Sequence, residues 1–399
     1  MVWEIARFGD LYEVDSRNGL TKPSKVRGAG YKMINMGELF ANDRIYDIPM
    51  ELVPLNENEK KNAKVECGDL LFARQSLVLE GAGKCSIVME TSPMTVFESH
   101  IIRVRLNKTE ANPLFYYYYF KSPYSAVKTI VSQCAQAGIR GSDLQELNVI
   151  HPSLDEQNRI AEILAYYDDL IENNQKQIKL LEEAAQRLYK EWFVDLRFPG
   201  YEDVQIVDGV PEGWKKTTIE NKCTLKKTIV HPEETQTGTA YIGLEHIPRH
   251  DFCLSNWGDA SEVSSNKYIY NQKDIIFGQI RPYFHKVGFA INDGVASTDS
   301  FIMKPDERCW GLFLLTVSSD AFVQFAYQTC KEGAKMPRAD WRQMKEYPLL
   351  IPGASLLCRF ETFVAEITDK IRTIVLQNRY LTEARNRLLP KLMSGEIEL

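Results

Sequence analysis

The spacing of apolar and polar positions predicts two long helices in this chain of 399 residues. From about Asp155 to Trp192, an apolar residue recurs in alternating steps of four and three, and no Gly or Pro interrupts the run. A second apolar seam with the same rhythm lies 200 residues later, from Phe360 to Leu392. Because steps of four and three are the heptad signature of a coiled coil, we expect the two segments to pair.

Each apolar seam contains one Asn, at positions that are not equivalent, and this mismatch predicts how the helices pair. An antiparallel register in which paired residue numbers sum to 552 places Asn174 opposite Asn378. The further pairs of this register are Ile171 with Leu381, Ile178 with Ile374, and Tyr167 stacked on Arg385. A slip of one heptad would leave each amide facing an apolar side chain. We therefore expect the Asn pair to fix the register; the alternative is two surface Asn on unrelated helices.

The segments before the two helices repeat each other. Asp69-Leu70-Leu71-Phe72-Ala73 is similar to Asp274-Ile275-Ile276-Phe277-Gly278, and strand-like runs between Gly- and Pro-rich turns occur in both halves. We expect short helices over 113–130 and 312–330. The predicted fold class is α+β: duplicated domains at 1–153 and 198–353, each followed by a long helix, at 154–197 and 354–399. A pseudo-two-fold arrangement is the expected result of such a duplication.

Composition narrows the class of protein. Apolar residues make up 44% of the chain, enough for sizeable cores, and no apolar run reaches the ~18 residues of a membrane span. The first residues lack the apolar stretch of a secretory signal. The eight Cys include no Cys-x-x-Cys pair, as in proteins with free thiols. These features predict a cytoplasmic protein that does not bind a membrane.

The charge distribution separates the helices from the loops. The segment 155–195 holds ten acidic and five basic residues, so it is a poor match for phosphates and a better one for a protein partner. Several loops have the opposite character, with Arg and Gln side chains that can pair with guanine and adenine. The candidate DNA-binding residues are Arg17, Lys22, Lys25, Arg27, Lys32, Arg74, Gln75, Ser76, Arg140, Gln279, Arg281, Tyr283, His285, Lys286, Lys335 and Arg338.

The sequence contains no convincing catalytic or metal-binding motif. Asn112-Pro113-Leu114-Phe115 is close to an adenine methyltransferase signature but lacks its second Pro, and Pro113 fits the first position of a helix. Gly81-Ala82-Gly83-Lys84-Cys85 lacks the first Gly and the Ser/Thr of a P-loop. His246 and His250 are four residues apart, but Pro248 lies between them. We expect no catalysis, no metal and no cofactor in this chain.

Four segments carry a resemblance to a known family. Pro152-Ser153-Leu154-Asp155-Glu156-Gln157 resembles the usual opening of the first long helix in type I restriction–modification specificity subunits, and 185–195 resembles the end of that helix in the same family. Val210-Pro211-Glu212-Gly213-Trp214 resembles the opening of their second target-recognition domain, and Leu388-Leu389-Pro390-Lys391-Leu392 resembles their C-terminal segment. The start of the second helix, 352–360, departs from the family because it lacks the Glu-Gln pair.

The resemblance implies a function and partners. Such subunits bind a bipartite target in double-stranded DNA and scaffold two adenine methyltransferase subunits, and two restriction subunits can join them. S-adenosylmethionine, ATP and Mg would belong to those partners, and this chain would be a non-catalytic component of host defence. Two alternative functions can be distinguished by binding measurements. A solitary adenine-N6 methyltransferase would itself bind S-adenosylmethionine, whereas a coiled-coil scaffold would show no salt-dependent binding to a duplex.

Overall fold

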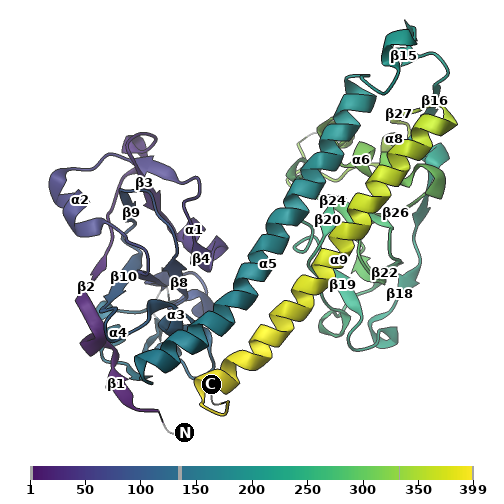
Figure 1. The fold of residues 1–399 in the computed structure, drawn as a ribbon. Coiled ribbons are helices and arrows are strands. Elements are labelled where there is room, and N and C mark those ends of the chain that lie inside the picture. Colours follow the sequence, from purple (N-terminus) through teal and green to yellow (C-terminus); the bar gives the residue numbers. More distant parts are fainter. Residues whose placement is uncertain (1–2, 134–136, 332, 398–399) are drawn as a thin grey trace. The chain divides into compact units, whose positions relative to one another are not determined.

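The computed structural model describes residues 3–133, 137–331 and 333–397. The chain forms two compact units. Unit 1 comprises 1–171 and 380–399, and unit 2 comprises 172–379. Each long helix therefore contributes one part to each unit (Figure 1).

Unit 1 is built on a five-stranded sheet and a three-stranded sheet. The larger sheet has the order β2 (Tyr12–Asn18), β10 (Ile101–Leu106), β6 (Leu70–Ala73), β8 (Cys85–Val88) and β4 (Arg44–Ile45). The smaller sheet has the order β5 (Glu51–Val53), β3 (Tyr31–Ile34) and β9 (Thr95–Phe97). A further ribbon pairs β1 (Ile5–Arg7) with β13 (Asn148–Ile150), directly before the first long helix. The four residues of β6 are all buried, as expected of a central strand with both faces covered.

Unit 2 repeats this plan. Its main sheet has the order β17 (Cys223–Lys226), β26 (Ser300–Pro305), β23 (Ile275–Gly278), β24 (Val287–Ala290) and β20 (Cys253–Leu254). Its second sheet has the order β18 (Ile229–Val230), β22 (Lys267–Tyr270), β25 (Gly294–Ser297), β19 (Ala240–Ile242) and β21 (Gly258–Asp259). A ribbon of β16 (Lys215–Thr218) and β27 (Pro348–Ile351) precedes the second long helix.

Strand directions match as well as strand order. In each five-stranded main sheet the last pair is parallel, β4 with β8 and β20 with β24, and the other pairs are antiparallel. The second sheets share one parallel pair, β3 with β9 and β19 with β25. The predicted duplication of an α+β domain is therefore confirmed at the level of topology.

The short helices are shorter than the sequence predicts. In unit 1, α3 (Pro113–Lys121) ends at Lys121 rather than near 130, and a separate 3-10 turn follows at Ala126–Ile130. In unit 2 the expected single helix is two, α6 (Trp310–Val317) and α7 (Asp320–Gln328). The break falls at Ser318 and Ser319, because the Ser319 hydroxyl accepts a hydrogen bond from the Phe322 N–H and so caps a new helix. The remaining short helices are α1 (Met36–Ala41), α2 (Glu57–Ala63), α4 (Gly141–Gln145) and α8 (Trp341–Met344).

The long helices are α5 (Leu154–Tyr189) and α9 (Ala354–Met393). A capping box starts α5: the Ser153 hydroxyl accepts from the Glu156 N–H at 3.4 Å, and the Glu156 carboxylate accepts from the Ser153 N–H at 3.1 Å. In unit 1, Ile160 and Leu164 of α5 share a buried core with Leu392 of α9. In unit 2, Trp192 packs on Phe360 with ring centroids 5.7 Å apart, a pair whose numbers also sum to 552. Figure 1 shows the two helices running antiparallel within each unit.

Within the described residues, no single helix is both long and apolar enough to cross a membrane. The segments Glu307–Val317 and Asp320–Gln328 reach that length and apolarity only when taken together, and they meet at a bend of 72°.

Candidate nucleic-acid interface and helix seam

In unit 2 the structure joins two of the loops singled out in the sequence. The segment 279–286 follows the central strand β23, and 335–338 follows α7. The Arg281 N–H donates to the Pro337 carbonyl at 2.7 Å, and the Ala339 N–H donates to the Gln279 carbonyl at 3.0 Å. An isolated β-bridge between Ile280 and Arg338 completes the contact. Two segments almost 60 residues apart in sequence thus form one surface.

This surface exposes side chains suited to nucleic acid. Arg281 and Lys335 are exposed, and the Tyr283 side chain keeps 46% of its surface exposed. Tyr283 is fixed at one edge by the Tyr327 ring, at a centroid distance of 5.4 Å. Arg338 is half exposed and pairs with Asp299 at 2.7 Å. An exposed aromatic ring and exposed cations on the same pair of joined segments combine a stacking face with donors for phosphate or base edges.

Two candidates in the same loop face inward instead. His285 is 5% exposed, and burial lowers the pKa of its ring. Lys286 is half buried and its ammonium donates to the Leu244 carbonyl, while burial lowers its pKa. Neither side chain is available to contact DNA in this structure. The sequence did not predict this orientation, because a short loop has no apolar periodicity that indicates which side chains point inward.

Unit 1 brings together the equivalent loops. Residues 75–76 form β7 (Gln75–Ser76), which pairs with β12 (Ala137–Gly138) after α3, and β12 pairs in turn with β11 (Ser132–Gln133). The Ile139 N–H donates to the Arg74 carbonyl at 2.9 Å. The Arg74 guanidinium is half buried and donates to the Ser99 carbonyl at 3.3 Å, whereas Arg140 is exposed at the start of α4. The same backbone contact therefore occurs in both units with different side chains.

The basic segment 17–32 is less positive than its sequence suggests. Carboxylates from later in the chain pair with three of its cations: Lys22 with Glu59 at 2.8 Å, Arg27 with Glu51 at 2.6 Å, and Lys32 with Asp47 at 2.7 Å. Hydrogen bonding to Lys22 lowers the pKa of Glu59, and hydrogen bonding to Lys32 lowers the pKa of Asp47. Arg17 donates to the Asn62 side chain at 2.8 Å, and Lys25 is exposed.

The helix seam contains the expected amide pair. The Asn174 Nδ2 group donates to the Asn378 Oδ1 atom at 2.8 Å, within unit 2. Of the neighbouring residues on the seam, Ile371 and Ile374 are buried and Ile178 packs against the unit 2 core. Ile171 and Leu381 lie half buried on the seam in unit 1.

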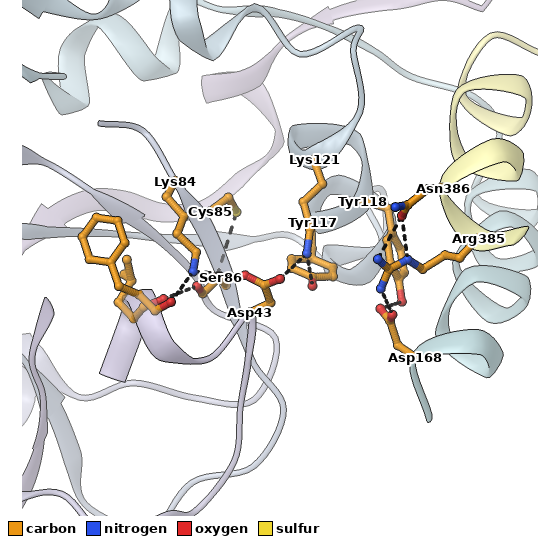
Figure 2. Close-up of polar contacts among 12 residues, drawn as sticks. Asp43, Lys84, Cys85, Ser86, Tyr117, Tyr118, Lys121, Asp168, Arg385 and Asn386 are labelled. Carbon is orange, nitrogen blue, oxygen red and sulfur yellow. Dashed lines mark hydrogen bonds and ion pairs between the residues drawn. The ribbon is translucent and has the colours of Figure 1, made fainter. Parts of the chain in front are cut away.

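Arg385 makes a different contact from the stacking on Tyr167 that the register suggested. Its guanidinium pairs with the carboxylate of Asp168, which also accepts the Tyr118 hydroxyl at 2.7 Å (Figure 2). Asp168 is 5% exposed, so α3, α5 and α9 are tied by a buried ionic network in unit 1. The seam pattern did not reveal Asp168 because this residue lies beside the seam rather than on it.

A second polar cluster in unit 1 also has no signal in the sequence pattern. Figure 2 shows Asp43 between Lys84 and Lys121, and its carboxylate lies 3.1 Å from the Lys84 ammonium. Burial raises the pKa of Asp43, but the two ammonium groups outweigh it and lower the pKa overall. Because Lys84 also donates to the Phe40 carbonyl and Lys121 to the Tyr117 hydroxyl, this cluster ties the residue before β8 to α3 within unit 1.

The motif-like segment at Asn112 has a structural role. Its side-chain oxygen accepts from the Leu114 N–H at 2.8 Å and caps α3, and its amide donates to Asn158 at 2.7 Å. Pro113 takes the first helical position, as expected. Among the described residues, the one group of histidine and carboxylate side chains close enough to hold a metal ion is His250, His285 and Asp320.

Comparison with known proteins agrees with this architecture. Residues 2–183 match the family described as the type I restriction modification DNA specificity domain. The MjaIX type I restriction enzyme specificity subunit of Methanocaldococcus jannaschii is 24% identical over 419 residues, covering 100% of this chain and 94% of that protein. The putative MjaX specificity subunit of the same organism is 26% identical and covers 68% of this chain and 63% of its own length.

A solved structure shares the fold. The S subunit of a type I restriction–modification system from M. genitalium superposes with a TM-score of 0.56 at 15% identity, over 98% of this chain and 96% of that one. The family match covers the first part of the chain, and the chain as a whole is similar to type I specificity subunits in sequence and in fold.

Proposed function

We propose that this chain reads a bipartite DNA target for a type I restriction–modification complex, with one half-site read by each unit. One observation carries the proposal. In both units, the loop after the buried central strand is joined by backbone hydrogen bonds to the loop after the following helix, and each of these surfaces exposes at least one arginine. Arg281, Tyr283 and Lys335 form the unit 2 surface, and Arg140 belongs to the unit 1 surface.

The proposal includes partners but no chemistry for this chain. The segment 155–195, with ten acidic and five basic residues, suits a protein subunit better than DNA. The resemblance to specificity subunits implies two methyltransferase subunits, with restriction subunits able to join. S-adenosylmethionine, ATP and Mg are assigned to those subunits, and the complex is assigned to the cytoplasm. The structural role of Asn112 supports a non-catalytic chain, because the one methyltransferase-like segment serves as a helix cap.

Methylome sequencing tests the proposal in a host that expresses this chain with its neighbouring methyltransferase. Deleting the chain should abolish one split adenine-methylated motif. Arg281→Ala should weaken or relax one half-site only, by about 1–3 kcal/mol, and leave the other half-site unchanged. The matched control is Arg308→Ala, which removes an 84% exposed arginine of the same unit outside both loops and should leave the motif intact.

Other outcomes would decide for the competing functions. An unchanged methylome after deletion would contradict the proposal. Binding of S-adenosylmethionine by the purified chain, together with methylation in a host that lacks the neighbouring methyltransferase, would indicate a solitary methyltransferase. Absence of salt-dependent duplex binding by the purified chain and by the complex would indicate a scaffold. Equal loss of both half-sites in Arg281→Ala would contradict the assignment of one half-site to each unit.

A further inference from the structure

Three side chains in unit 2 converge although they are far apart in sequence. His250 lies in the turn before β20, His285 ends the 3-10 turn after β23, and Asp320 is the first residue of α7. One donor atom from each lies within 4.8 Å of the others, and the His285 Nδ1 atom is 3.2 Å from the Asp320 Oδ1 atom. The two imidazole rings have their centroids 4.6 Å apart.

The hydrogen bond at the far side of His285 decides which nitrogen faces the cluster. The Nε2 atom lies 2.8 Å from the Ser318 carbonyl, which can only accept, so Nε2 carries a proton. In the neutral ring the lone pair then lies on Nδ1, which faces the carboxylate of Asp320. Two acceptors at this distance repel each other unless a proton or a cation lies between them. An imidazole held by a backbone carbonyl is also the usual arrangement of a metal-ligating histidine.

We propose that His250, His285 and Asp320 form a binding site for a zinc-class divalent cation. Two imidazole nitrogens and one carboxylate oxygen are ligands that Zn²⁺ accepts, and water would fill a fourth position. Donor atoms around a tetrahedral Zn²⁺ lie about 3.3 Å apart, given bonds of ~2.0–2.1 Å. The His285–Asp320 pair already has this spacing, and the third donor has to approach by about 1.5 Å at most.

The backbone already fixes the two histidines with respect to each other. The His250 N–H donates to the His285 carbonyl at 3.1 Å. Of the three side chains, Asp320 and His250 are exposed at the mouth of the cluster, while His285 lies beneath them. A cation can therefore enter from solvent by a small movement of two exposed side chains, without opening the core.

The cation would hold the exposed loop that carries Arg281 and Tyr283. His285 lies near the end of this loop, two residues before β24, and a metal shared with Asp320 would tie the loop to α7. This consequence rests on the proposed function, whereas the metal site does not. No sequence motif marks the site, because its ligands are 35 residues apart at each step and lie on three separate elements.

Metal titration of the full-length, tag-free chain tests the proposal. After dialysis against EDTA, Co²⁺ is added and its d–d absorption is followed, and bound Zn²⁺ is counted after gel filtration. About one equivalent of metal should bind. His250→Ala and Asp320→Asn change exposed groups, and each should weaken binding about ten-fold or more. Asp320→Asn leaves the Ser319 cap of α7 in place.

His231→Ala is the matched control, because His231 is an exposed histidine of the same unit outside the cluster, and metal binding should not change. Failure of the wild-type chain to bind Co²⁺ or Zn²⁺ would overturn the proposal and leave a protonated His285 paired with Asp320. Unaltered binding in both variants would overturn it as well. Since the readout is metal and not DNA, these results stand apart from the test of DNA recognition.

Discussion

Glu182, on the unit 2 part of α5, provides a test of the buried structure through pH. Its side chain is 4% exposed, and its Oε1 atom accepts the N–H groups of Phe252 at 2.9 Å and Cys253 at 2.7 Å. Burial, with a smaller contribution from Asp251, raises the pKa of this carboxyl from 4.5 to about 8, although the two N–H groups act in the opposite direction.

The sign of the pH effect depends on which state holds the proton. Between pH 4.5 and about 8 the folded protein keeps Glu182 protonated, whereas the unfolded chain has released that proton. The contribution of Glu182 to the free energy of unfolding is therefore highest below pH 4.5, falls as the pH rises to about 8, and is constant above it. At ~1.4 kcal/mol for each pKa unit, the full effect is on the order of 5 kcal/mol.

Glu182→Gln removes this slope, because the amide keeps an oxygen that accepts the same two N–H bonds and does not ionise. The free energy of unfolding of the variant should match that of the wild type near pH 5. It should then exceed the wild-type value by about 1.4 kcal/mol more for each pH unit up to about 8. Denaturant unfolding at several pH values measures this difference through tryptophan fluorescence. The signal reports unit 2, since five of the six tryptophans lie there: Trp192, Trp214, Trp257, Trp310 and Trp341.

The control is Glu183→Gln, at a neighbouring carboxylate whose side chain is 39% exposed and pairs with Arg187. Its stability relative to the wild type should not change with pH between 5.5 and 8.5. If the difference between Glu182→Gln and the wild type is also flat over this range, the carboxyl does not titrate as its burial requires, and the reasoning fails.

Two further predictions concern the long helices. Asn174→Leu should lower the free energy of unfolding by about 1–2 kcal/mol, because it leaves the Asn378 amide without its partner. Adding Asn378→Leu should restore the stability but loosen the helix register. A double variant with one defined structure and an unchanged spacing between the DNA half-sites would contradict a register role. Arg385→Ala should lower the free energy of unfolding, measured with denaturant, by about 3 kcal/mol, because it leaves the buried carboxylate of Asp168 without its cation. Combining it with Asp168→Asn should recover part of this loss. A loss below about 1 kcal/mol would contradict a stabilising buried ion pair.

The long helices and their register were predictable because their signal is local and periodic. Every step of four or three in the seam restricts the same face, and a single amide in each seam is enough to select one alignment. The structure brings those two amides to 2.8 Å. The duplicated domains were predictable for a related reason, since a repeated strand sequence implies a repeated place in a sheet.

The ionic partners of the candidate DNA-binding residues were not predictable in the same way. Glu59 lies 37 residues from Lys22, and, beside the helix seam, Asp168 lies 217 residues from Arg385. Nothing in the local pattern links such pairs, because tertiary folding decides which carboxylate reaches which cation. Inward-facing His285 shows the same limit: its loop is rich in polar residues, and its direction depends on the Ser318 carbonyl, 33 residues away.

The two units differ in the loops that follow their central strands, β6 and β23. They share the stem of these loops, which is the central strand together with the turn before it. Asp69 and Asp274, directly before the central strands, are both buried, and each accepts the N–H three residues earlier at 2.7 Å. The preceding residue is left-handed in both, with φ of 94° at Gly68 and 70° at Lys273. The turn is present even where its glycine is not, so the direction of the central strand is the property that both units retain.

The cations around this stem differ between the units, in contrast to the turn itself. Asp69 pairs with Arg105 on β10, whereas Asp274 pairs with Lys226 on β17, a different strand of the equivalent sheet. Beyond the strand, unit 1 continues as a short β-ladder, and unit 2 as a 3-10 turn with Arg281 at φ 51°. A fixed stem with variable loops lets each unit present different side chains from the same backbone position. The proposed reading of two unlike half-sites by one duplicated fold requires this property.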